Sequence, residues 1–450
     1  MNFVVFLFLS FSLNGYVQSY WRVETEGRAN FSWIQNTLNA KVHQNIKDRV
    51  ILYGEVELDY LGFPGINDFN DLLRQERINP FRIVDREIYV QFPKVFGFID
   101  VKMGDLIEKW GTADTFNPTD LINPYNLEDP LDFGESIPVP AIRLRIPFGD
   151  LFTFTGLYIP IFRPAQLPLT SLRAGPEATP LPSEIYDLIE DIKNMPGIYA
   201  DMEGIFRSVK KIPLLPDSSP KNSAFALKAG GLIGGFDWSI SFYHGREDMP
   251  MPATGSFVMN FDEEGRLFLE EGQIFLVYPE IKAIGFDTST SIPFLDTGFW
   301  FEGAVIFPSS ITQVIEYRVG DLKGSFIEKR LKSPYFKFTA GIDYTFKGGF
   351  YTNVQFVRGF FDEIGNEMIK NYIFAGFQDQ ILSDRIRYRL FGGYTIDDNS
   401  FVIYPEVGFM PYEEGEIVVG GYILTGSKTS KFGQPGAGGD QVFIKFKASF

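Results

Sequence analysis

The chain has 450 residues, 45% of them hydrophobic and 22% charged, a balance that excludes a disordered chain. No stretch approaches the roughly 20 consecutive apolar residues of a spanning helix, so a helical membrane protein is also excluded. There is no cysteine and the formal net charge is -16, which excludes a disulfide framework and argues against nucleic acid as a partner.

The chain begins with an apolar run from Phe3 to Leu13, followed by Val17-Gln18-Ser19. Such a run, with small residues before a cleavage point, predicts a secretory signal peptide over residues 1–19. Met1-Asn2 departs from the usual pattern because it carries no Lys or Arg. The alternative, an apolar first strand, is disfavoured because the residues from Phe3 to Leu9 do not alternate with polar ones.

Polar and apolar residues alternate in many segments after residue 20, as in strands with one wet face and one apolar face. The alternation predicts about 18 strands, and 16 is the main alternative because 37–46 is weak. The predicted strands lie near 21–33, 37–46, 48–60, 82–93, 96–106, 139–148, 150–160, 222–233, 235–245, 273–286, 292–306, 335–346, 349–360, 371–382, 384–396, 400–410, 415–425 and 440–450.

The connections between these strands tend to alternate in length. Joins such as 94–95, 149, 234 and 347–348 are short, whereas 61–81, 107–138, 161–221, 246–272 and 307–334 are long. Short periplasmic turns and long extracellular loops are typical of outer-membrane barrels. We therefore predict an all-β fold, a single transmembrane antiparallel β-barrel domain over residues 20–450.

The longest connection, 161–221, contains apolar residues at helical spacing. Ile185, Leu188, Ile189 and Ile192 would share one helix face, between Ser183 as an N-cap and Pro196-Gly197 as a stop. A short helix is therefore expected in this loop. It would either fold into the lumen and narrow it or cap the extracellular rim.

Charged residues on the polar faces predict a charged lumen. An inward basic ladder and an acidic wall would create a transverse field that orients polar solutes, unless these charges pair across neighbouring strands. The arginine triplet of residues 385, 387 and 389 is the best candidate for solute contact, because guanidinium groups bind carboxylates and phosphates. The ladder consists of Arg143, Arg145, Arg385, Arg387, Arg389, Lys445 and Lys447, and the wall of Glu24, Glu26, Glu55, Glu57 and Asp59.

The segment from Trp110 to Pro124 contains two Asn-Pro units, which specify successive rigid turns. It resembles the W-G-x-x-D-x-x-N-P-x-D-x-x-N-P signature of a family of bacterial outer-membrane proteins of unassigned function, similar in build to alginate-type and other substrate-selective porins. The resemblance implies a barrel and transport, without naming a solute. The loop would constrict the lumen or simply pack. The matching residues are Trp110, Gly111, Asp114, Asn117, Pro118, Asp120, Asn123 and Pro124.

The chain stops on an alternating segment, Gln441 to Phe450, with a terminal aromatic residue. This segment resembles the C-terminal sorting strand of outer-membrane barrels, which implies recognition by the barrel insertion machinery and closure against the first strand. With 21–33 as that first strand, Lys445 and Lys447 would face Glu24 and Glu26 across the seam.

The sequence predicts a channel in the bacterial outer membrane, in contact with its lipids, for small polar solutes that are anionic or zwitterionic. A gated channel for hydrophobic compounds is the alternative within transport, suggested by 47 phenylalanines. A barrel enzyme and a surface scaffold or adhesin are the rivals of another class. His43 and His244 have no matching nucleophile motif, so we predict no enzyme, no cofactor and no metal site. Association into a homotrimer is left open.

Overall fold

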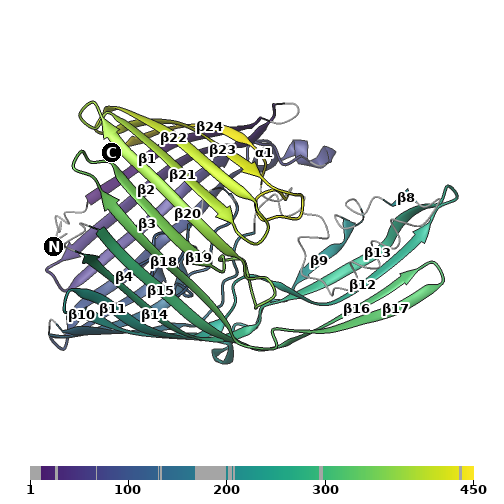
Figure 1. The fold of residues 1–450 in the computed structure, drawn as a ribbon, viewed down its shortest axis with the longest axis horizontal. Coiled ribbons are helices and arrows are strands. Elements are labelled where there is room, and N and C mark those ends of the chain that lie inside the picture. The colour runs from purple at the N-terminus through teal and green to yellow at the C-terminus, as the bar shows by residue number, and fades with distance from the viewer. Residues whose placement is uncertain are drawn as a thin grey trace, which may run out of the picture.

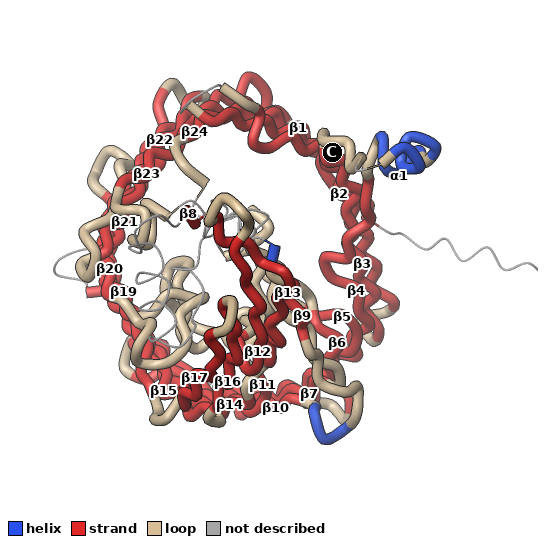
Figure 2. The backbone as a smooth tube through the Cα atoms, turned by 90° about the vertical axis from the view of Figure 1, so that its right-hand side faces the viewer, coloured by secondary structure: helices blue, strands red, loops and turns tan. Residues whose placement is uncertain are grey.

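A computed structural model describes residues 12–25, 29–66, 68–129, 131, 134–149, 151–167, 199–200, 205, 208–292, 297–434 and 438–450. Within these residues, 18 strands form one closed antiparallel sheet (Figures 1 and 2). They are β1 (Ser12–Glu24), β2 (Phe31–Ile46), β3 (Val50–Leu61), β4 (Phe81–Val95), β5 (Ile99–Leu106), β6 (Val139–Phe148), β7 (Phe152–Ile159), β10 (Ala224–Ile233), β11 (Phe236–Arg246), β14 (Glu280–Ile292), β15 (Thr297–Pro308), β18 (Tyr335–Thr345), β19 (Tyr351–Arg358), β20 (Asn371–Ile381), β21 (Ile386–Thr395), β22 (Phe401–Tyr412), β23 (Gly415–Thr425) and β24 (Gln441–Ser449).

The alternation of the sequence becomes the two faces of this wall. Leu58, Ile240 and Val354 are exposed on the outside, whereas Asn39 and Glu57 are buried on the inside. Closure pairs the strand edges, so the wall can face lipid without unsatisfied backbone groups. An 18-strand barrel with an apolar outer face is an outer-membrane architecture, which confirms the predicted fold class and location.

The described helices are short: η1 (Phe69–Leu73), α1 (Gln75–Ile78) and η4 (Pro220–Asn222). None of the helices in the described ranges is long and apolar enough to cross a membrane. The helix predicted within 161–221 falls outside the described residues.

The predicted strand number is confirmed, but the predicted boundaries are wrong in two places. The segment 21–33 is divided between β1 and β2, which form a hairpin in which Glu24 N donates to Asn30 O over 2.9 Å. The predicted strands 273–286 and 292–306 begin several residues too early. Residues up to Val277 belong to another sheet, and the barrel strands begin only at Glu280 and Thr297. The alternation of polar and apolar residues can continue through a hairpin turn. It therefore did not show where one strand ends and the next begins.

Three of the predicted long loops, 161–221, 246–272 and 307–334, contain strands of a second sheet that extends from one end of the barrel (Figure 1). Its strands β12 and β16 run parallel, and each forms a hairpin with the strand that follows it. Phe257, Ile274 and Ile315 belong to its own apolar cluster. The sheet comprises β8 (Tyr199–Ala200), β9 (Lys210–Pro213), β12 (Met251–Phe261), β13 (Arg266–Val277), β16 (Ile311–Val319) and β17 (Leu322–Arg330).

The barrel closes between β1 and β24, as the C-terminal segment predicts. The register differs from the prediction: Lys445 lies opposite Tyr20, and Lys447 lies opposite Gln18. The difference arises because β1 begins at Ser12, well before residue 21. The predicted signal peptide, residues 1–19, therefore overlaps β1 by residues 12–19. The signal peptide stays a prediction.

Cysteine pairs across this seam test both the register and the N-terminal boundary. We expect Gln18→Cys with Lys447→Cys to form a disulfide under mild oxidation, because the two residues are cross-strand partners and the chain has no other cysteine. Mass spectrometry of the linked peptides measures the yield. Tyr20→Cys with Lys447→Cys is the mismatched control and should link poorly. If Tyr20→Cys with Lys445→Cys links while the pair at residue 18 does not, the mature chain begins after residue 18.

Candidate functional site: a loop across the lumen

Residues 107–138, here called the lumen loop, run inside the barrel and contact separate parts of its wall. The loop hydrogen-bonds Glu302 of β15 and Asn353 of β19 on one side. It forms ion pairs with Arg22 of β1 and Arg82 of β4 on the other. The loop therefore bridges the lumen, which favours the constriction that the sequence left open.

Glu302 is the main anchor of the lumen loop. Its Oε2 accepts from Thr112 N at 2.9 Å and Ala113 N at 3.1 Å, and its Oε1 accepts from Thr119 N at 2.8 Å and Thr119 Oγ1 at 2.7 Å. The Glu302 side chain is fully buried, so these donors replace its hydration. Gly111 makes the approach possible: its φ is +102°, and a Cβ there would collide with the Glu302 carboxylate.

The residues of the Asn-Pro motif hold the lumen loop together. Asn123 Nδ2 donates to Leu106 O at 2.8 Å and to Ile137 O at 2.9 Å, which joins the two ends of the loop. Asn117 Nδ2 donates to Trp110 O at 3.4 Å, and Asp120 Oδ1 accepts from Trp110 N at 3.4 Å. The motif therefore specifies a self-bonded loop conformation. Pro118 and Pro124 line the cavity behind it.

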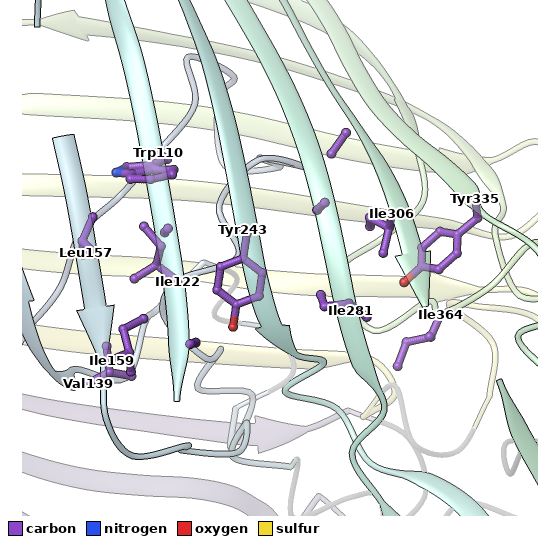
Figure 3. Packing of buried hydrophobic residues seen from close by; sticks show 14 of the residues in the cluster. Trp110, Ile122, Val139, Leu157, Ile159, Tyr243, Ile281, Ile306, Tyr335 and Ile364 are labelled. Atoms are coloured by element: carbon purple, nitrogen blue, oxygen red, sulfur yellow. The ribbon is translucent and has the colours of Figure 1, made fainter. Parts of the chain in front are cut away.

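Apolar contacts fix the lumen loop against the wall. Trp110 and Ile122 belong to a buried cluster that includes Leu157 and Tyr243 of the wall strands (Figure 3). Phe116, further along the loop, stacks on Phe374 of β20 with 4.3 Å between the ring centroids. Removing any of these large side chains would leave a cavity, so packing and the Glu302 hydrogen bonds support the same loop position.

Ion pairs hold the other side of the lumen loop. Arg22 Nη1 lies 2.8 Å from Asp129 Oδ1, and Arg82 Nη2 lies 2.6 Å from Glu128 Oε2. Asp114 accepts from Asn353 at 2.8 Å. These acidic residues of the loop thus bind different parts of the wall.

The acidic wall is largely neutralised by basic residues on adjoining strands. Glu55 lies 2.9 Å from Lys41, Glu57 lies 2.6 Å from Arg86, and Asp59 lies 3.3 Å from Arg82. The geometry thus favours cross-strand pairing over a free acidic wall at these three positions. Glu24 lies opposite Gln441 at the seam, and Glu26 falls outside the described residues.

The arginine triplet does not act as one ladder. Arg387 Nη2 lies 2.6 Å from Glu416 and 3.3 Å from Glu406, and Arg389 Nη2 lies 3.0 Å from Glu406. Arg385 is exposed in the turn before β21. Arg385 therefore does not join Arg387 and Arg389 on the inner face of the wall. The reason is that β21 begins at Ile386, one residue after the first arginine of the triplet.

Two lysines of the ladder stand apart from the paired arginines. Lys445 Nζ lies 4.4 Å from the centroid of the Tyr20 ring, and Lys447 Nζ lies 4.3 Å from that of Tyr16. Among the described residues, no carboxylate forms an ion pair with either lysine. Ring faces attract cations without cancelling their charge. These two ammonium groups therefore contribute net positive charge to the lumen.

Several cavities lie along the lumen loop, and charged residues line the two largest of those described. The larger, of about 550 Å³, contains Arg387, Arg389, Lys445 and Lys447, with three carboxylates from Asp114, Glu406 and Glu416. The smaller, of about 440 Å³, contains Lys109, Arg143, Arg145 and Lys228, with three carboxylates from Glu108, Asp237 and Asp287. Each of these two cavities thus has four cations against three carboxylates, whereas a third, of about 190 Å³, has three cations against four carboxylates.

Two residues of this arrangement, Glu302 and Lys228, were not predicted from the sequence. Glu302 is the only charged residue in the segment from Phe299 to Ile306, and its position gives it the inward face. A single inward carboxylate in an otherwise apolar strand segment is a sequence signal for an anchor of this kind. Lys228 lies 5.7 Å above the Trp110 ring, a contact that only the fold brings together.

Two carboxyl groups outside the strands bear on the position of the lumen loop: Asp120, which is buried within the loop, and Asp248, which contacts it. Burial raises the pKa of Asp120 to about 7, and the nearby Glu302 carboxylate raises it further while Lys109 and Lys228 oppose it. Burial also raises the pKa of Asp248 to about 6, assisted by Glu247 and opposed by Lys337. Asp248 accepts from Tyr125 N of the loop at 3.1 Å.

The seating of the lumen loop should weaken as pH rises. Because both folded-state pKa values lie above the unfolded value near 3.8, the stabilisation is complete below about pH 4. It is lost as pH passes 6 for Asp248 and 7 for Asp120. We expect larger current fluctuations at pH 8 than at pH 5 in planar-bilayer recordings. Asp120→Asn should reduce this dependence, since asparagine can still accept from Trp110 N. Equal dependence in both proteins would contradict the assignment.

No family model matches the chain, and no curated protein matches it. Among solved structures, OccAB3 of Acinetobacter baumannii is similar over 98% of this chain and 99% of that chain, with 7% identity and a TM-score of 0.49. OccAB1 of the same organism is similar over 98% and 95%, with 8% identity and a TM-score of 0.49. The outer membrane channel DcaP of A. baumannii is similar over 98% and 97%, with 10% identity and a TM-score of 0.39. These similarities carry no conclusion about a solute, and the family resemblance of the Asn-Pro motif stays a prediction.

Proposed function

We propose that this protein is a passive outer-membrane channel for small polar solutes, with a preference for anions. The single observation that carries the proposal is the lumen loop, which bridges a charged lumen and leaves two cavities with excess basic groups. A barrel of this width encloses more space than its wall side chains can fill. A loop that narrows this space determines which solutes pass.

Two features support the anion preference. Lys445 and Lys447 present ammonium groups in the larger cavity, and Arg143, Arg145 and Lys228 line the smaller one. A positive potential in a narrow channel raises the local concentration of anions. The paired carboxylates of both cavities would keep the lumen hydrated and limit how tightly an anion is held. Rapid passage needs such weak binding.

Planar-bilayer recording tests the proposed channel directly. We expect stepwise conductance from the purified protein and, in a gradient of potassium chloride, a reversal potential of the sign for chloride preference. The measurement should be repeated with a variant that lacks residues 181–197, so that the loop outside the described residues cannot mask a pore. Absence of conductance from both proteins would overturn the proposal.

The rival functions have less support. Many phenylalanines, among them Phe225, Phe242 and Phe286, are exposed on barrel strands and fit a lipid-facing surface, which weakens the case for a hydrophobic-compound channel. His43 lies in β2 and His244 in β11, two strands that do not pair. An enzyme reading would gain support if lipid or peptide turnover were abolished by His43→Ala or His244→Ala.

A further inference from the structure

The connection between β3 and β4, residues 62–80, lies at the outer side of the barrel. Viewed along the barrel, α1 stands outside the ring of strands (Figure 2). This connection includes η1 and α1, which follow each other from Phe69 to Ile78. It therefore extends away from the lumen, in contrast to the lumen loop.

Local hydrogen bonds give this connection a defined shape. The Asp68 side chain caps η1 by accepting from Asn70 N at 2.7 Å and Asp71 N at 3.2 Å, and the Asp71 carboxylate accepts from Asp68 N at 3.4 Å. Gly65 N donates to Arg77 O at 2.8 Å and closes the connection on itself. A capped, closed segment holds its side chains in fixed directions.

Large apolar side chains point out of this shaped segment. Phe69 is 74% exposed, Leu72 48% and Leu73 75%. Phe69 and Leu72 are three residues apart in a 3₁₀ helix, so they lie on one side of it. An apolar surface of this kind on a compact segment indicates a contact with something other than water.

The adjoining wall indicates what that contact is. Phe81 and Ile83, at the start of β4, are 60% and 73% exposed on the outer face. Further along the wall, beyond β3, Trp21 of β1 and Phe31 of β2 meet edge to face with 6.3 Å between their centroids. Aromatic residues at the end of a barrel strand are typical of the membrane interface. The apolar side chains of residues 62–80 therefore continue the lipid-facing surface beyond the strands.

We propose that residues 62–80 form a lateral foot that rests on the outer leaflet of the membrane, with Phe69, Leu72 and Leu73 inserted at the boundary between headgroups and acyl chains. Continuity with the lipid-facing wall is the reason to choose lipid over another protein chain. Arg74 is exposed and directly follows Leu73, so it can contact lipid phosphates, whereas Arg77 lies 3.6 Å from Asp71 within the connection. The foot would resist tilting of the barrel in the membrane.

Site-directed spin labelling tests the foot, because the chain has no cysteine of its own. Leu73→Cys carries the nitroxide in the full chain, reconstituted in vesicles of phosphatidylcholine and phosphatidylglycerol. Ile83→Cys is the lipid-facing reference. Ile327→Cys, on the projecting strand β17 and 68% exposed, is the matched apolar control in water. We expect the ratio of oxygen to nickel-complex accessibility at residue 73 to be several-fold above that at 327 and close to that at 83.

Two outcomes would overturn the proposal. A ratio at residue 73 equal to that at 327 would mean that the foot stands in water. Spin–spin broadening between labels at 73, lost on dilution with unlabelled protein, would mean that the foot contacts a second copy. The same measurement at Phe69→Cys guards against a local effect of one label. Neither outcome depends on whether the barrel conducts.

Discussion

Replacing Glu302 by alanine should release the lumen loop and raise the single-channel conductance several-fold. The substitution leaves three backbone N–H groups and the Thr119 hydroxyl without their acceptor. Each buried donor left unpaired costs about 1–3 kcal/mol, so the docked position of the loop would lose several kcal/mol relative to a hydrated one. A loop displaced from the lumen no longer narrows it.

Planar-bilayer conductance and thermal unfolding of the purified protein measure this effect. Glu302→Gln should be intermediate, because its oxygen still accepts from one pair of donors while its NH₂ group faces the other pair. Asp379→Ala is the matched control: its carboxylate binds Tyr388 and has no described contact with the lumen loop. Unchanged conductance and unfolding temperature in Glu302→Ala would show that packing around Trp110 and Phe116 suffices to hold the loop.

The wall of the barrel was predictable because its pattern is local. Each strand carries its own alternation of polar and apolar residues, and the lengths of the connections assign the two ends. The Asn-Pro motif was likewise visible, and its side chains bond mostly within the loop: Asn123 reaches Leu106 and Ile137, both close in sequence. Local sequence patterns were therefore enough to predict the fold class and to identify the Asn-Pro motif as one structured loop.

The partners of the charges were not predictable, since they depend on register over long separations. A change in the start of β1 moved Lys445 from opposite Glu24 to opposite Tyr20. Glu302 and Thr112 are 190 residues apart, and neither local sequence indicates that the two residues form a hydrogen bond. Residues 273–277, which the alternation assigned to the barrel, belong instead to the second sheet. Interactions between strands decide these points.

Changing Lys445 and Lys447 together to glutamine should move the reversal potential toward cations. These two ammonium groups lie over the Tyr20 and Tyr16 rings, and no described carboxylate forms an ion pair with either. Their removal changes the larger cavity from four cations against three carboxylates to two against three. Conductance should remain, because glutamine is similar in length and the wall is otherwise unchanged. The measurement is the reversal potential in a gradient of potassium chloride.

Arg387→Gln with Arg389→Gln is the matched comparison, with the same change of charge in the same cavity. Both guanidinium groups are paired with Glu406, whose side chain is buried. Removing them leaves this carboxylate unpaired, so it would be expected to take up a proton or to lower stability. We therefore expect a smaller shift in reversal potential than from the lysines, together with a lower unfolding temperature. A larger shift in reversal potential from the arginine variant than from the lysine variant would contradict this prediction. It would show that Arg387 and Arg389 attract anions in the lumen even though they are paired with Glu406.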